Sequence, residues 1–172
     1  YALLVYETDW YFTRYEDRFA SHNNVHKAFG INVDIMNPGV VETQPGFVQP
    51  KFIDWLFVGH ISNGLKRVRS IERLPGMRMA IGAVDKIDKR DVSCLRAAGV
   101  HVAEGMTSYT DLASFYRASF HVAVPTPDYG GGERATLEGL ACGCEVSVAH
   151  DNDKLKNLLC SAIPTHRLYA RD

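Results

Sequence analysis

Long hydrophobic runs, a basic leader and an excess of either charge are missing from this sequence. A membrane-spanning helix needs about 20 consecutive apolar residues, and no run in the 172 residues comes near that length. The start of the chain lacks the pattern of a signal peptide and soon meets Glu7 and Asp9. A net charge of -1 provides no overall field that would attract nucleic acid or anionic lipid. We therefore expect a cytoplasmic protein with no transmembrane segment and no nucleic-acid partner.

Metal-binding and disulfide patterns are also missing. The four cysteines form no C-x-x-C pair, and Cys142 and Cys144 are too close for an ordinary structural zinc site. Of the seven histidines, His22 and His26 lie four residues apart, but no acidic or cysteine ligands surround them. We expect reduced thiols in or near the core, as suits a reducing cytoplasm, and neither a metal ion nor a cofactor.

Short apolar runs that alternate with helix-period segments predict an α/β protein from residue 55 onward. Predicted strands cover residues 55–59, 77–83, 100–103, 120–124 and 146–149. Predicted helices cover residues 65–74, 91–98, 110–118, 133–141 and 152–159. Because such alternation builds right-handed βαβ units, the expected fold is Rossmann-like, an open and mostly parallel sheet with flanking helices.

The first fifty residues have a different pattern. They predict strands at 2–6 and 33–36 and an aromatic-rich helix at 10–20. Prolines and a glycine make residues 41–51 typical of a linker. We therefore divide the chain into an N-terminal segment with linker, residues 1–50, and a Rossmann-like domain, residues 51–172.

A glycine-rich loop is the most informative stretch. Residues 125–138 join a predicted strand to a predicted helix through Gly130–Gly132. Glycines let the backbone approach a ligand, and the helix start offers free N–H groups and a positive dipole, which suits a diphosphate. Glu138, within the helix, is placed to accept hydrogen bonds from two ribose hydroxyls. The alternative is a plain turn, with Glu138 paired to Arg134 on the helix surface.

Basic residues follow the first predicted strand of the sheet. Gly59 ends this strand, and a polar loop containing His60 leads to Lys66 and Arg67. Cations at the carboxyl end of a strand can neutralise phosphate charge. A solvated basic helix face is the alternative interpretation.

A dinucleotide fingerprint is a weaker rival. Gly130, Gly132 and Ala135 satisfy G-x-G-x-x-A, and Asp151 follows the next predicted strand. However, five residues separate Val124 from Gly130, whereas the fingerprint places its first glycine in a tight turn directly after the strand. An NAD-dependent oxidoreductase therefore stays a minor alternative.

Taken in order, the blocks from residue 55 to 159 resemble the C-terminal domain of GT-B glycosyltransferases, especially the large retaining family 4. That family has a strand ending in Val-Gly and then a basic residue at a helix start, as in Val58-Gly59 and Lys66-Arg67. Later it has a short strand, a glycine and a helix, as at 102–119. A strand, a proline, a glycine-bearing loop and the pattern "lEama.G.pV" follow, as at 124–146.

The resemblance implies a nucleoside-diphosphate sugar as the donor, and transfer of its sugar without a metal and with retention of configuration. It implies catalytic roles for Lys66, which would stabilise the diphosphate charge, and for Glu138, which would hold the ribose. Gly105 and Met106 would lie near the nucleobase. The full set of implied donor-binding residues is Gly59, His60, Arg67, Gly105, Met106, Gly130, Gly131, Gly132 and Glu133.

The sequence also departs from that family. Its members usually carry two glutamates in E-x7-E, but Gly130 stands eight residues before Glu138, which leaves Glu133 as a candidate substitute. The resemblance further implies an acceptor domain. We expect this domain to be missing, to be truncated so that residues 1–40 are its remnant, or to be supplied by a second chain. A non-catalytic nucleotide-sugar-binding or regulatory module is the alternative function.

Overall fold

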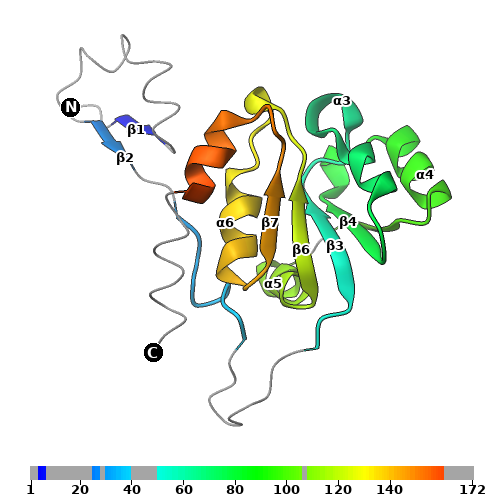
Figure 1. Ribbon diagram of the computed structural model, residues 1–172, viewed down its shortest axis with the longest axis horizontal. Coiled ribbons are helices and arrows are strands. Elements are labelled where there is room, and N and C mark those ends of the chain that lie inside the picture. Colours follow the sequence, from blue (N-terminus) through cyan, green and yellow to red (C-terminus); the bar gives the residue numbers. More distant parts are fainter. Residues whose placement is uncertain (1–3, 7–24, 28–29, 40–49, 106–107, 161–172) are drawn as a thin grey trace.

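The computed structural model describes residues 4–6, 25–27, 30–39, 50–105 and 108–160. Its main feature is a five-stranded parallel sheet in the order β5-β4-β3-β6-β7 (Figure 1). The strands are β3 (Ile53–Val58), β4 (Arg78–Gly82), β5 (His101–Glu104), β6 (Ser119–Val124) and β7 (Glu145–Val148). A separate parallel pair is formed by β1 (Leu4–Tyr6) and β2 (Val25–Lys27).

Helices connect the strands of the sheet in the predicted alternation. The short helix α3 (Asn63–Lys66) and the 3₁₀ helix η1 (Val68–Arg73) follow β3. The connections after β4 and β5 are η2 (Val84–Lys86) with α4 (Lys89–Ala97), and α5 (Tyr109–Arg117). After β6 come η3 (Asp128–Gly130) and α6 (Glu133–Ala141), and residues 153–160 are helical after β7. The expected Rossmann-like α/β fold is confirmed.

Two hydrophobic cores lie on opposite faces of the sheet. Because successive side chains of a strand point to opposite faces, Leu56 belongs to one core and Phe57 to the other. The first core includes Ala113 and Tyr116 of α5, and the second includes Leu95 of α4. Both faces of β3 are thus covered, which explains why residues 55–58 of this strand are all apolar.

The segment 30–39 is a turn, and the strand expected at 33–36 is wrong. The backbone N–H of Met36 donates to the carbonyl oxygen of Asn32 at 2.8 Å, and the Asn32 side chain accepts from the N–H of Asp34 at 3.1 Å. Asn side chains that bond the backbone in this way favour turns over strands. The Met36 side chain is fully buried in the first core, and Arg117 donates to the carbonyl oxygens of Ile35 and Asn37. This segment therefore packs on the same core as the sheet.

The single helix expected at 65–74 is also wrong, because the chain breaks at Arg67. This residue has a φ of 49°, which makes it a left-handed cap between α3 and η1. The Asn63 side chain accepts a hydrogen bond from the N–H of Arg69 at 3.2 Å and so helps to hold the turn. The apolar spacing of three that suggested an α-helix belongs in part to the 3₁₀ helix, in which Val68 and Ile71 are buried.

Several other expectations concern the remaining residues. The strand expected at 2–6 is present as β1, while the helix expected at 10–20 and residues 41–49 of the expected linker lie outside the described residues. No helix in the described part of the chain is long and apolar enough to cross a bilayer.

Cys142 and Cys144 are buried free thiols, as expected, whereas Cys160 is exposed. Burial raises the pKa of Cys142 to about 12 and that of Cys144 to about 11.

Candidate functional site

A cavity of about 420 Å³ opens at the carboxyl edge of the sheet. The chain runs from β3 outward to β4 and β5 and then returns to β6 on the other side of β3. The strand order therefore reverses beside β3, and ligands of open α/β sheets bind at such switch points. The cavity is lined by the ends of β3 and β4, by α3 and α5, and by the start of α6, with the residues Val58, Gly59, His60, Lys66, Ile81, Gly82, Ala83, Lys86, Tyr109, Leu112, Gly132, Glu133, Arg134, Ala135 and Glu138.

Lys66 is the last residue of α3 and is half-buried in the cavity wall. Its Nζ lies 3.3 Å from the point that a Cβ on Gly131 would occupy, so it faces the glycine-rich loop directly. Burial lowers the pKa of this lysine, the Glu133 carboxylate counteracts that effect, and the Lys154 ammonium adds to it. Lys66 forms no ion pair within the described residues, so its charge faces the cavity.

The backbone of the glycine-rich loop lies so close to its neighbours that a residue with a side chain would clash there. Gly132 has a φ of +112°, and a Cβ there would lie 2.6 Å from Cγ1 of Val124. A Cβ on Gly130 would lie 3.0 Å from the carbonyl oxygen of Leu65, so the loop packs against the end of α3. Gly132 is the N-cap of α6 and has no capping side chain, which leaves the first N–H groups of the helix available to a ligand.

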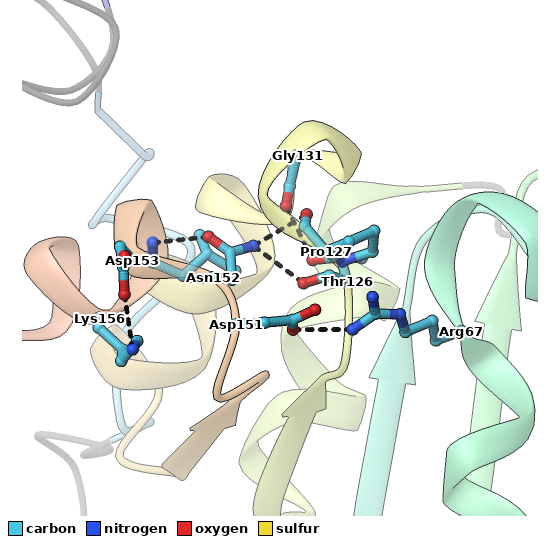
Figure 2. Close-up of polar contacts among 9 residues, drawn as sticks. Arg67, Thr126, Pro127, Gly131, Asp151, Asn152, Asp153 and Lys156 are labelled. Atoms are coloured by element: carbon cyan, nitrogen blue, oxygen red, sulfur yellow. Dashed lines mark hydrogen bonds and ion pairs between the residues drawn. The ribbon is translucent and has the colours of Figure 1, made fainter. Parts of the chain in front are cut away.

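Asn152 holds the glycine-rich loop from behind (Figure 2). Its buried side-chain amide donates to the carbonyl oxygens of Thr126 at 2.9 Å and Pro127 at 3.0 Å. Within the loop, the Thr126 hydroxyl donates to the carbonyl oxygen of Gly131 at 2.9 Å. These bonds satisfy the carbonyl groups of Thr126 and Gly131, and they add a second donor to the carbonyl of Pro127, which also accepts from the N–H of Gly130 at 2.8 Å. They fix the backbone leading into α6.

A buried ion pair lies beside the same loop. Nζ of Lys154, on the helix 153–160, is 2.6 Å from Oε1 of Glu133, the first residue of α6. The Lys154 side chain is 0% exposed and that of Glu133 is 6% exposed, so water screens this pair very little. Glu133 also lines the cavity, with its charge already balanced by Lys154.

Glu138 lies at the bottom of the cavity and is held by two tyrosines. Its Oε1 accepts from the Tyr109 hydroxyl at 2.8 Å, and its Oε2 accepts from the Tyr116 hydroxyl at 3.0 Å. Burial raises the pKa of Glu138, although both hydroxyl groups and the nearby Arg134 lower it in part. The carboxylate thus accepts hydrogen bonds from two tyrosines of α5, and the surface ion pair with Arg134, the alternative drawn from the sequence, is not formed within the described residues.

The structure brings six of the residues implied by the resemblance into one cavity. They are Gly59, His60, Lys66, Gly132, Glu133 and Glu138. Burial lowers the pKa of His60, the positive charges of Lys66 and Lys86 lower it further, and the Asp85 carboxylate counteracts them in part. Gly130 and Gly131 form the adjoining loop.

The remaining candidates lie elsewhere. Nη1 of Arg67 lies 2.7 Å from Oδ1 of Asp151 (Figure 2). Arg67 also lines a separate hollow of about 260 Å³. Asp151, the acidic residue of the dinucleotide alternative, is therefore already paired. Gly105 donates its N–H to the carbonyl of Gly82, one strand away from the cavity wall. Met106 lies outside the described residues.

Sequence reasoning missed several residues of this site. Tyr109 and Leu112 of α5 line the cavity, as does Lys86 of η2. Their position after β5 and β4, at the carboxyl edge of the sheet, was the one signal that could have found them. Asn152 and Lys154 follow β7 and so carry the same positional signal, but nothing in their spacing points to contacts with the loop after β6.

The strand reversal and the cavity beside it define a Rossmann-like α/β domain with a ligand-sized site at its switch point. Sucrose-phosphate synthase from Thermosynechococcus elongatus has this fold, with a TM-score of 0.56, 16% sequence identity, and coverage of 95% of this chain. The match spans 49% of that protein, so this chain corresponds to about half of its length.

A second solved structure is similar over a smaller part of the chain. It is the C-terminal domain of a glycosyl transferase group 1 family protein from Francisella tularensis. The TM-score is 0.48 and the identity 14%, with coverage of 78% of this chain and 88% of that domain. No protein-family model and no curated protein matches the chain. The similarity to sucrose-phosphate synthase confirms a glycosyltransferase-like fold, which is what the sequence resemblance implied.

Proposed function

We propose that this chain binds a nucleoside-diphosphate sugar and forms the donor-binding half of a glycosyltransferase. The observation that carries this proposal is the position of Lys66, half-buried and without an ion pair in the described residues, opposite the start of α6. An ammonium group and free helix N–H groups on two sides of one cavity suit a diphosphate. A cavity of about 420 Å³ also has the volume of ordinary ligand sites.

The nucleoside would extend from the diphosphate toward Glu138. The carboxylate lines the cavity, and two tyrosine hydroxyls fix both of its oxygens in place. Each carboxylate oxygen has a second lone pair, so Glu138 retains the capacity to accept from ribose hydroxyls. Gly105 and Met106, which follow β5, are proposed to lie on the nucleobase side.

The proposed reaction transfers the sugar to an acceptor with retention of configuration and without a metal. The acceptor hydroxyl would attack from the face that the diphosphate leaves, and the protein would stabilise the negative charge that develops on the leaving diphosphate. Lys66 and the N–H groups around Gly131 and Gly132 would supply this stabilisation, and preorganised donors are usually the largest contribution of this kind. The acceptor would be held by another domain or a second chain.

A non-catalytic nucleotide-sugar-binding or regulatory module is the second candidate. Gly130 replaces the first glutamate of the family pattern, and Glu133, the possible substitute, is tied to buried Lys154. A carboxylate held in this buried ion pair is poorly placed to contact the transferred sugar. Release of free nucleoside diphosphate from a panel of donors, with and without simple acceptors, separates the two candidates, since the module produces none.

Calorimetry against UDP, GDP and ADP, each paired with its nucleoside, tests the binding proposal. We expect one diphosphate to bind and its nucleoside to bind about ten- to a hundred-fold more weakly, as the loss of a charge-assisted hydrogen bond predicts. Titration with NAD tests the minor alternative. Failure of all three diphosphates to bind at millimolar concentration would contradict the proposal.

A further inference from the structure

Three charged side chains lie beside the glycine-rich loop, and only two of them form an ion pair with each other. Lys154 forms the buried ion pair with Glu133 at 2.6 Å, whereas Lys66 is left without a pair in the described residues. Oε2 of Glu133 lies 3.5 Å, and Nζ of Lys66 lies 3.3 Å, from the same point beside Gly131. Lys66 is therefore close enough to be captured by Glu133 if that carboxylate were to lose its partner.

We propose that Lys154 is a positioning residue that keeps Lys66 available to a diphosphate by occupying Glu133. This inference rests on the proposed function of the cavity. Two lysines and one carboxylate carry a net charge of +1. Because Lys154 and Glu133 form the ion pair, the unbalanced charge lies on Lys66, the one of the two lysines that lines the cavity. A carboxylate that is 6% exposed cannot stay ionised without a partner, so without Lys154 it would turn to Lys66.

The position of Lys154 in the chain supports this role. It lies two residues after Asn152, whose side chain holds the carbonyl groups of Thr126 and Pro127 (Figure 2). One short segment thus fixes both the backbone of the loop and the charge of the first residue of α6. Lys156, two residues further along the helix, instead pairs with Asp153 in the same turn and is 45% exposed.

The first test measures the affinity for inorganic pyrophosphate by calorimetry in Lys154→Met, Lys66→Ala and the double variant. We expect each single variant to weaken binding by about tenfold or more, and the double variant to be no weaker than either single variant, because Lys66 is already captured. The double variant Lys154→Met/Glu133→Gln should recover most of the affinity, since no carboxylate is left to capture Lys66. Lys156→Met, the matched control, should bind like the wild type.

Additive losses in Lys154→Met and Lys66→Ala would overturn the proposal, because they would show two lysines that attract the anion independently. Wild-type affinity in Lys154→Met would overturn it as well. If Lys154→Met does not fold, Glu133→Gln alone decides. Glu133→Gln leaves no carboxylate that could capture Lys66, so pyrophosphate should bind at least as tightly as in the wild type, and weaker binding would contradict the inference.

A measurement without ligand separates this inference from the proposed function. Lysines are labelled by reductive ¹³C-methylation, and the Lys66 signal, assigned by its absence in Lys66→Ala, is titrated by NMR. The pKa of Lys66 should rise in Lys154→Met and return toward the wild-type value in Lys154→Met/Glu133→Gln. An unchanged Lys66 titration overturns the positioning role, whereas wild-type protein that binds no pyrophosphate and no nucleotide overturns the proposed function alone.

Discussion

The hydroxyl of Tyr116 donates a 3.0 Å hydrogen bond to Oε2 of Glu138, and both side chains are buried. Tyr116 is fully buried in the first core, so this bond ties the floor of the cavity to the interior of the domain. Burial, followed by the Glu138 charge, raises the pKa of Tyr116 well above its usual range, so the hydroxyl stays a donor at any ordinary pH. The orientation of the candidate ribose-binding carboxylate therefore depends on core packing.

Replacement of Tyr116 by Phe should destabilise the protein. The change removes the donor but keeps the ring, so Oε2 of Glu138 loses its buried partner. We expect the free energy of unfolding to fall by about 1–3 kcal/mol, as is usual when a buried acceptor is left unsatisfied. Urea denaturation measures this change, and Tyr109→Phe, at a half-exposed site, should cost less. Equal losses for the two variants would argue against the special role of the buried bond.

Glu138 should make stability depend on pH in a definite direction. Burial raises its pKa above the usual value of 4.5, so the folded state holds this proton more tightly than the unfolded state. Its contribution is fully present below the unfolded pKa and is lost as the pH rises through the folded value. The stability of the wild type relative to Glu138→Gln should therefore fall between acid and neutral pH.

Urea unfolding of both proteins over a pH series checks this expectation. Asp34→Asn, which removes an exposed carboxylate in the segment 30–39, controls for the general change in net charge. A stability difference that increases with pH would show that the hydrogen bonds from Tyr109 and Tyr116 outweigh burial at Glu138.

The glycine-rich loop should not tolerate a side chain at position 132. In Gly132→Ala, the new Cβ would lie 2.6 Å from Val124 and 2.9 Å from Oγ1 of Thr126, at a φ of +112° that non-glycine residues avoid. We expect a loss of about 1–3 kcal/mol in the free energy of unfolding. Gly64→Ala is the matched control, because its Cβ would meet nothing within 4 Å in the helix α3. That variant should be neutral or slightly more stable, and a comparable loss there would refute the steric argument.

Much of this fold could be predicted from sequence because each element of the sheet carries its own signal. Residues 55–58 of β3 are all apolar, and the predicted helix at 133–141 coincides with α6. Since the carboxyl ends of parallel strands share one edge, Lys66 and Glu138 could also be expected to meet at one site. Arg67 could not be separated from Lys66, because one left-handed residue turns its side chain toward Asp151.

The partners of the charged residues were beyond sequence reasoning. Glu138 bonds residues that precede it by 29 and 22 positions, and Glu133 pairs with Lys154 on a later helix. No periodicity links such residues, and helix propensity is the same whichever partner a carboxylate finds. Local spacing instead suggested Arg134 for Glu138, an interaction between adjacent turns of one helix.

Lys66 and Arg67, which are neighbours in sequence, should differ in their effect on ligand binding. Lys66→Ala should weaken diphosphate binding by about ten- to a hundred-fold, with little effect on the nucleoside. Arg67→Ala should change neither affinity appreciably, because Arg67 is paired with Asp151 at a separate hollow. Calorimetry with matched diphosphate and nucleoside measures both. An equal loss of diphosphate affinity in the two variants would return Arg67 to the candidate site.

Glu138 should recognise the ribose of the nucleotide. Glu138→Gln keeps the size of the side chain but replaces one acceptor oxygen with a donor, so the side chain can no longer serve Tyr109, Tyr116 and a ribose together. We expect ribonucleotide binding to weaken by about 1–3 kcal/mol. The wild type should prefer the ribonucleotide over its 2′-deoxy form, because the deoxy ligand lacks one of the two hydroxyls from which the carboxylate accepts hydrogen bonds.

Glu138→Gln should lose much of this preference, which gives a non-additive cycle between protein and ligand. Glu145→Gln removes an exposed carboxylate at the edge of the sheet and serves as the charge control, so it should keep the wild-type preference. Calorimetry of the four protein–ligand pairs gives the coupling directly. If the ratio of ribonucleotide to deoxyribonucleotide affinity is the same in the wild type and Glu138→Gln, the carboxylate serves only to bind the two tyrosines, and another group must recognise the sugar of the nucleotide.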